Sequence, residues 1–281
     1  MKNKKVPAKK PKHFLEGYIM KTKRKKRSKG TGKRGIYILP NLFTSASLFG
    51  GFFAIIAAIQ GRYETAAIAI LISCVFDGLD GKIARLTHST SLFGTEYDSL
   101  SDLVAFGVAP GILAFQWALE PFGRLGWLAC FMYVICGALR LARFNVQKNY
   151  VDPNFFKGLP IPAAACFIAS LVLFTTAVGG LLPQLKQIVI IILVYILSFL
   201  MVSSIRYPSF KEFELKKQKP FNVLVATILV LVVVAYKPKI MLFFIMGTYL
   251  LSGPVITLYR LRKKRTTEDT LLKEAPTVEK E

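Results

Sequence analysis

Long apolar segments recur through most of this chain, and they constrain its fold more than any other feature. Runs of about 17–25 mostly apolar residues, the length that an α-helix needs to cross a bilayer, recur from Leu39 almost to Tyr259. Inside lipid every backbone amide must find a hydrogen-bond partner within the protein, and a helix provides these partners within one segment. The sequence therefore predicts an all-α fold, a polytopic bundle of membrane helices.

We expect eight spans, arranged as a six-span core followed by a C-terminal pair. Their approximate bounds are 40–60, 65–80, 98–117, 125–144, 160–180, 188–205, 221–236 and 240–258. A polar segment at 82–91 separates the second span from the third. The domains that follow are a basic, disordered tail (1–37), a catalytic transmembrane core (38–206), the C-terminal transmembrane pair (207–259) and a second tail (260–281).

Positive charge is concentrated outside the apolar runs. The net charge is +22, and 15 Lys and Arg residues precede Ile38. A basic tail can bind nucleic acid, but this one contains no recognisable nucleic-acid module. Beside a membrane domain, such a tail more simply fixes orientation and attracts anionic lipid headgroups. We therefore expect the lipid bilayer, and no nucleic acid, as its partner.

The charges between the spans predict the orientation. If eight spans alternate with both termini in the cytoplasm, most of these cations fall on the cytoplasmic side, as the positive-inside rule requires. The cytoplasmic cations are then Lys82, Arg85, Arg140, Arg143, Lys148, Lys157, Arg206, Lys211 and Lys216. The outer ones are Arg62, Arg124, Lys186, Lys237 and Lys239. The sequence thus predicts a multi-pass protein of the cell (inner) membrane with cytoplasmic termini.

Four aspartates lie within 26 residues at the edge of the apolar spans: Asp77, Asp80, Asp98 and Asp102. A charged side chain in the bilayer costs roughly 2.5–3.5 kcal/mol even on the lenient insertion scale, so such groups usually pair or line a site. Four carboxylates without nearby cations would repel one another. Hard Mg²⁺ or Mn²⁺ prefers oxygen ligands and supplies the missing positive charge. A bound divalent cation is the simplest prediction.

The spacing of the aspartates suits helices. Asp77 and Asp80 are three residues apart and Asp98 and Asp102 four apart, so each pair shares one helix face. Consecutive helices joined by a short turn run antiparallel, which lets the two pairs face each other. Two metals about 3.5–4 Å apart could then stabilise the attacking and leaving oxygens of a phosphoryl displacement. Arg85 could bind a phosphate through two hydrogen bonds.

A cation transporter is the alternative from another functional class. Carboxylates within the membrane can coordinate a moving ion, and many transporters are built from inverted repeats. This sequence shows no such repeat, and its aspartates lie beside a polar segment rather than in the middle of a span. The enzyme hypothesis is therefore preferred.

The aspartate segment matches the pattern D-x2-D-G-x2-A-R-x8-G-x3-D-x3-D at every fixed position. It resembles the signature of the CDP-alcohol phosphatidyltransferase family. The resemblance implies two Mg²⁺ or Mn²⁺ ions held by Asp77, Asp80, Asp98 and Asp102, with Asp102 also acting as the catalytic base. It further implies a homodimer, and contacts with a CDP-lipid from Gly81, Arg85, Ser91 and Asn41.

Three further segments, 101–111, 137–145 and 157–162, resemble the branch of that family in which serine is the acceptor. This implies transfer of a phosphatidyl group from CDP-diacylglycerol to L-serine, with glycerol 3-phosphate or inositol as alternative acceptors. Arg140 and Arg143, three apart on one helix, could receive the serine carboxylate. Both could instead anchor the helix at the cytoplasmic surface.

Overall fold

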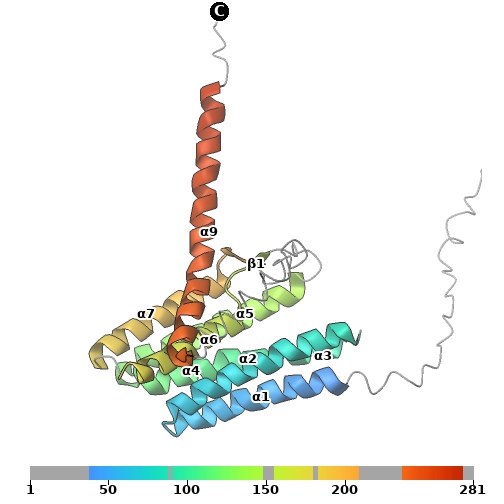
Figure 1. Ribbon diagram of the computed structural model, residues 1–281, viewed down its shortest axis with the longest axis vertical. Coiled ribbons are helices and arrows are strands. Elements are labelled where there is room, and N and C mark those ends of the chain that lie inside the picture. Colours follow the sequence, from blue (N-terminus) through green and yellow to red (C-terminus); the bar gives the residue numbers. More distant parts are fainter. Residues whose placement is uncertain are drawn as a thin grey trace, which may run out of the picture. The chain divides into compact units, whose positions relative to one another are not determined.

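The computed structural model of the protein describes residues 38–87, 89, 91–147, 155–179, 183–208 and 236–274, which are almost entirely helical (Figure 1). The predicted N-terminal tail lies outside these residues, as does the predicted seventh span except for Tyr236.

A helix covers each of the other predicted spans. In chain order these helices are α1 (Ile38–Ile59), α2 (Tyr63–Leu86), α3 (Leu92–Asp102), α4 (Ala109–Ala114), α5 (Arg124–Gln147), α6 (Ile161–Ala177), α7 (Pro183–Val202) and α9 (Pro238–Glu274). Two π-helical segments, η1 (Leu103–Val108) and η2 (Phe115–Leu119), flank α4, and a 3₁₀ turn, η3 (Glu120–Phe122), follows η2. The third predicted span is therefore one helical rod that changes its winding along its length. Helix α9 continues past residue 259, where the C-terminal transmembrane pair was predicted to end and the second tail to begin.

The described helices have the character of membrane helices. Four segments are long and apolar enough to cross a bilayer: Ile38–Ile59, Leu92–Phe122, Arg124–Val146 and Pro238–Thr257. Large apolar side chains on the described helices are exposed, with Phe49 of α1 70% exposed, Phe131 of α5 55% and Phe199 of α7 71%. Exposed apolar surface of this extent is typical of a protein that contacts lipid. The chain is thus an all-α, multi-pass membrane protein in its main architecture.

Close packing of α1 against its neighbours sets the position of the aspartate segment. Helix α1 packs along α2 and also contacts α3, η1 and α4. Gly51 allows α1 to approach the backbone of η1, because a Cβ at this position would lie 2.5 Å from the Cα of Ala105. Small residues at such interfaces let helix backbones approach closely. As a result η1, which directly follows Asp102, is held against α1.

The connection between α2 and α3 is shorter than the sequence predicted. Residues 82–91 were expected to form a polar segment between spans, but α2 continues to Leu86 and α3 already begins at Leu92. The Ser91 hydroxyl accepts a hydrogen bond from the Gly94 amide at 2.9 Å and caps α3. A charged sequence can remain helical where a helix leaves the membrane. The first charged residue after the span therefore did not mark the end of α2.

A small antiparallel ribbon joins the ends of α5 and α7, and the all-α prediction did not include it. Strand β1 (Phe155–Lys157) pairs with β2 (Arg206–Pro208), with Phe156 opposite Tyr207. Gly158 follows β1 with a φ of +79°, and a Cβ there would lie 2.4 Å from the Met201 carbonyl oxygen. Only glycine fits this position without strain. The 157–162 segment that suggested the serine branch therefore includes a structural requirement for glycine.

Helix α9 packs against α6 and β2. Phe243 of α9 stacks on Phe174 of α6, with ring centroids 4.5 Å apart. Lys239, in the first turn of α9, forms a salt bridge with Glu64 in the first turn of α2. The C-terminal helix is therefore attached to α2, which carries Asp77 and Asp80.

Candidate functional site

Three of the four predicted aspartates converge. One carboxylate oxygen from each of Asp77, Asp98 and Asp102 lies within 4.8 Å of the other two. Asp77 comes from α2, Asp98 and Asp102 come from consecutive turns of α3, and all three side chains are partly buried. The antiparallel helix pair expected from the sequence therefore brings carboxylates from both helices to one point.

The fourth aspartate, Asp80, is held separately. It is 5% exposed, and its Oδ2 accepts a hydrogen bond of 2.6 Å from the Thr44 hydroxyl of α1. The Thr44 backbone carbonyl in turn accepts a hydrogen bond from Ser101 at 3.1 Å. Thr44 thus contacts the Asp80 carboxylate and the residue before Asp102, and it links α1 to both arms of the aspartate segment.

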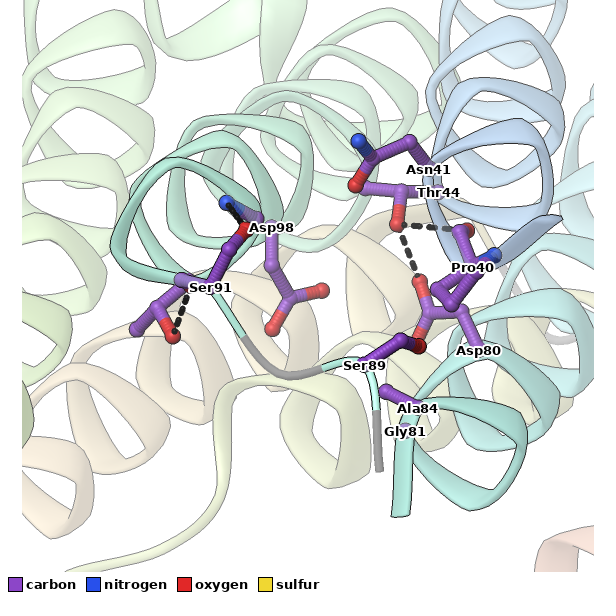
Figure 2. Close-up of a pocket in the computed structure, with 11 residues that line it drawn as sticks. Pro40, Asn41, Thr44, Asp80, Gly81, Ala84, Ser89, Ser91 and Asp98 are labelled. Carbon is purple, nitrogen blue, oxygen red and sulfur yellow. Dashed lines mark hydrogen bonds between the residues drawn. The ribbon is translucent and has the colours of Figure 1, made fainter. Parts of the chain in front are cut away.

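A pocket opens beside these carboxylates, with a volume of about 590 Å³ including its open mouth. Figure 2 shows the carboxyl groups of Asp98 and Asp80 on opposite sides of the pocket, with Thr44 beside Asp80. The lining residues are Pro40, Asn41, Thr44, Asp80, Gly81, Ala84, Ser89, Ser91, Gly94, Thr95 and Asp98.

The residues predicted to contact a CDP-lipid differ in their placement. Asn41, Gly81 and Ser91 line the pocket, and a Cβ at Gly81 would meet nothing within 4 Å, so there is open space beside the backbone. The hydroxyl of Ser91 is already engaged in capping α3. Arg85 is exposed and does not line the pocket, because its Nε donates a hydrogen bond of 2.9 Å to the Gly81 carbonyl of its own helix.

The two arginines predicted to bind the acceptor are also in different environments. Arg143 donates a hydrogen bond of 3.1 Å to the backbone carbonyl of Val202 at the end of α7, an anchoring contact. Arg140 is largely buried, and its Nε has no hydrogen-bond partner among the described residues. It lies close enough to Asp102 and Tyr249 to interact electrostatically with both. Of the two, Arg140 has an electrostatic interaction with an aspartate, whereas Arg143 bonds a backbone carbonyl.

The arrangement fits a divalent cation. Asp77, Asp98 and Asp102 offer hard oxygen ligands from two helices, the chemistry that Mg²⁺ and Mn²⁺ prefer. The Oδ1 atom of Asp102 is buried and has no hydrogen-bond partner in the part of the chain that the structure describes. Buried polar atoms are normally satisfied, so this oxygen is a suitable ligand atom.

Sequence reasoning missed several polar residues of this region. Thr44 lies three residues after Asn41, so it shares a helix face with a residue that was identified, and this spacing was a usable signal. Ser89 is buried in the short connection. Tyr249 is more than 140 residues away from the aspartates along the chain, and no local pattern marked it.

A family model matches more than half of this chain. Residues 37–202 match the family model described as CDP-alcohol phosphatidyltransferase. The matched region contains the whole aspartate segment, all the pocket-lining residues and Arg140, whereas α9 lies beyond it.

Several curated relatives are similar over longer regions. A CDP-diacylglycerol–serine O-phosphatidyltransferase of Helicobacter pylori is 41% identical over 81% of this chain and 94% of its own length. An enzyme of the same name from Bacillus subtilis is 35% identical over 62% of this chain and 92% of its own. An archaetidylserine synthase of Methanothermobacter thermautotrophicus is 40% identical over 60% of this chain and 69% of its own.

Proposed function

The chain belongs to the CDP-alcohol phosphatidyltransferase family, and we propose that it transfers a phosphatidyl group from CDP-diacylglycerol to the hydroxyl of L-serine, giving phosphatidylserine and CMP. The observation that carries this proposal is the convergence of Asp77, Asp98 and Asp102 beside a pocket. The choice of serine is supported by the relatives from Helicobacter pylori and Bacillus subtilis, whose names state serine as the acceptor.

In this reaction the pocket between α1, α2 and α3 holds the CDP group. Gly81 leaves room for the diphosphate close to the helix backbone, and Asn41 lies at the wall formed by the start of α1. The acyl chains extend along the apolar outer faces of the helices. Binding of both substrates beside the same carboxylates aligns the reacting atoms, and such positioning can supply much of the rate enhancement.

Asp102 acts as the base. Its carboxylate removes the proton from the serine hydroxyl, whose oxygen forms a new bond to the phosphorus that carries diacylglycerol. The bond from that phosphorus to the CMP oxygen breaks, and the electron pair leaves with CMP. Arg140, which lies near Asp102, receives the serine carboxylate and holds the hydroxyl near the phosphorus.

Two divalent ions, Mg²⁺ or Mn²⁺, are the proposed cofactors. Asp77, Asp98 and Asp102 would hold them, with Asp80 as a further ligand. When bound, they supply positive charge that offsets the charge of the diphosphate. Thr44 fixes the Asp80 carboxylate by its short hydrogen bond and so limits the directions in which that ligand can point.

The proposed topology has a six-span core plus two C-terminal spans, in the cell membrane, with both termini in the cytoplasm. Two contacts between distant helices fit this alternation. The first turns of α2 and α9 meet through Glu64 and Lys239, and the ends of α5 and α7 meet through Arg143 and Val202. We also propose that the protein is a homodimer. Its proposed domains are an N-terminal tail (1–37), a catalytic core (38–206) and a C-terminal transmembrane pair (207–259).

An acceptor panel tests the function. The purified full-length protein is supplied with CDP-diacylglycerol, Mg²⁺ or Mn²⁺, and one acceptor: L-serine, glycerol 3-phosphate or inositol. We expect CMP release with serine that is at least about 100-fold faster than with the other two, since a site that pairs polar substrate groups strongly rejects mismatched substrates. Faster release with glycerol 3-phosphate or inositol would reject serine as the acceptor while keeping the family chemistry. Metal flux through proteoliposomes without CDP-lipid would instead support a transporter.

A further inference from the structure

The helical rod that carries two of the aspartates changes its winding directly after Asp102. Segment η1 begins at Leu103, and at its end the Ala109 amide donates to the Val104 carbonyl, five residues earlier, where an α-helix would bond four residues back. A π turn thus takes up one residue more than an α turn. One residue of an α-helix corresponds to a rotation of about 100°, so the winding of η1 affects the direction in which the aspartates of α3 point.

A tyrosine of the neighbouring helix α5 supports this π segment. The Tyr133 side chain is fully buried, and its hydroxyl donates a hydrogen bond of 3.1 Å to the Phe106 carbonyl in the middle of η1. In an α-helix this carbonyl would accept a hydrogen bond from residue 110, but Pro110 has no N–H group. A buried carbonyl without a donor is costly. Tyr133 therefore supplies a donor where the proline cannot.

The second π segment of the rod has a matching tyrosine. In η2, the Gln116 carbonyl accepts a hydrogen bond of 2.9 Å from the Tyr63 hydroxyl of α2. Its α-helical donor would be Glu120, whose amide bonds the Phe115 carbonyl, and its π-helical donor would be Pro121, which has no N–H group. The two tyrosines thus make the same kind of contact. Only η1 adjoins the aspartates, because α4 separates η2 from it.

The neighbouring helices fix η1 at two consecutive residues. Ala105 lies against Gly51 of α1, where no Cβ fits, and Phe106 accepts the hydrogen bond from Tyr133 of α5. Both residues of η1 are completely buried. A change to α winding would move this part of the backbone against both contacts. The contact from Tyr133 is therefore a specific support for the π winding and not merely a part of the general packing.

We propose that Tyr133 is a positioning residue that holds the winding of η1 and so directs the carboxylates of Asp98 and Asp102 toward Asp77. Carboxylate oxygens of these three aspartates lie within 4.8 Å of one another. The inference rests on the proposed function, because it takes this cluster to be the metal site. It adds that the geometry of the site depends on a hydroxyl of α5 that acts through the backbone of η1.

The test compares Tyr133→Phe with Tyr63→Phe in the full-length protein. Both keep the ring and remove one hydroxyl that bonds a carbonyl of a π segment. For Tyr133→Phe we expect the Kd for Mn²⁺, measured by electron paramagnetic resonance, to rise about tenfold, as for other residues that orient metal ligands. The rate of CMP release with serine should also fall about tenfold. Tyr63→Phe should change both values less than twofold.

Thermal unfolding of the metal-free protein separates positioning from stability. Each variant loses one hydrogen bond, so both should lose a similar 2–4 °C or so in the unfolding temperature. If the loss of Mn²⁺ affinity is similar in the two variants, Tyr133 only supports the fold and the positioning role is rejected. If Tyr133→Phe binds Mn²⁺ as the unmodified protein does, the role is rejected and the proposed function stands. If the unmodified protein binds no Mn²⁺, the proposed metal site fails and this inference with it.

A second variant changes the winding through the backbone. Pro110→Ala supplies an amide that can bond the Phe106 carbonyl in α geometry, in competition with the Tyr133 hydroxyl. We expect it to weaken Mn²⁺ binding in the same direction as Tyr133→Phe while the tyrosine is still present. This variant decides the question if Tyr133→Phe does not fold. Unchanged Mn²⁺ binding in Pro110→Ala would show that the winding of η1 does not direct the aspartates.

Discussion

The two sides of the site are built in different ways. The donor side, which comprises the pocket-lining residues, Asp77 and Asp102, comes from α1, α2, α3 and the short connection, a single segment from Pro40 to Asp102. The proposed acceptor side instead depends on Arg140 of α5, which lies outside that segment.

Under the proposed function, the residues that bind the CDP group and the metal ions are therefore separate from those that select the acceptor. A CDP group and its metal ions need several ligands at fixed spacing, and two antiparallel helices with a short turn provide them within one compact motif. An acceptor needs few contacts, and these can come from any helix that reaches the same carboxylates. Acceptor recognition can therefore vary among related enzymes while the donor side stays the same, because the two are carried by different helices.

The largest effect is expected on the donor side, from Asp102→Asn. An amide cannot take the proton from the acceptor hydroxyl, so CMP release should fall by about 10³-fold or more, the contribution typical of a positioned base. CDP-diacylglycerol should still stabilise the variant against thermal unfolding. Glu96→Gln is the matched control, since it makes the same chemical change at an exposed position of α3. Turnover by Asp102→Asn at a rate near that of the unmodified protein would exclude Asp102 as the base.

The second-largest effect is expected from replacing Arg140, and it should distinguish this residue from Arg143 of the same helix. Arg140→Ala should lower kcat/KM for serine about 100-fold, or about 2.7 kcal/mol, because it removes a largely buried charge that pairs with the acceptor. Arg143→Ala removes only the hydrogen bond to Val202, which should reduce the free energy of unfolding by about 1 kcal/mol. Steady-state kinetics and thermal unfolding distinguish these effects. A larger rise in the KM for serine in Arg143→Ala would reverse the assignment of the acceptor side.

The smallest effect is expected from Thr44→Val. Valine keeps the shape of threonine but removes the hydrogen bond to Asp80, so the affinity for Mn²⁺ should fall about tenfold, as for other residues that orient metal ligands. Electron paramagnetic resonance of Mn²⁺ measures this without turnover. Thr248→Val, which affects an exposed threonine of α9 whose hydroxyl bonds its own helix, is the control. Unchanged Mn²⁺ binding in Thr44→Val would show that the hydrogen bond from Thr44 does not orient a metal ligand.

Sequence reasoning was most successful where the chemistry is local. Carboxylates three and four residues apart share a helix face whatever the rest of the chain does, so the approach of Asp77 to Asp98 and Asp102 could be predicted. It was less successful at helix ends, because residues 82–86, which include the charged Lys82 and Arg85, continue α2. It gave equal weight to Arg140 and Arg143, whose environments depend on helices that are distant in the sequence.

The sequence by itself determined that this protein is a bundle of membrane helices and that four aspartates share one small region, since span length and helical spacing are local properties. The tertiary structure decided which side chains meet. It placed the Thr44 hydroxyl against the Asp80 carboxylate, and it bonded Arg143 to the backbone carbonyl of Val202 at the end of α7. Such meetings depend on how helices pack, and packing depends on side-chain shape across the whole bundle, which no short spacing in the chain records.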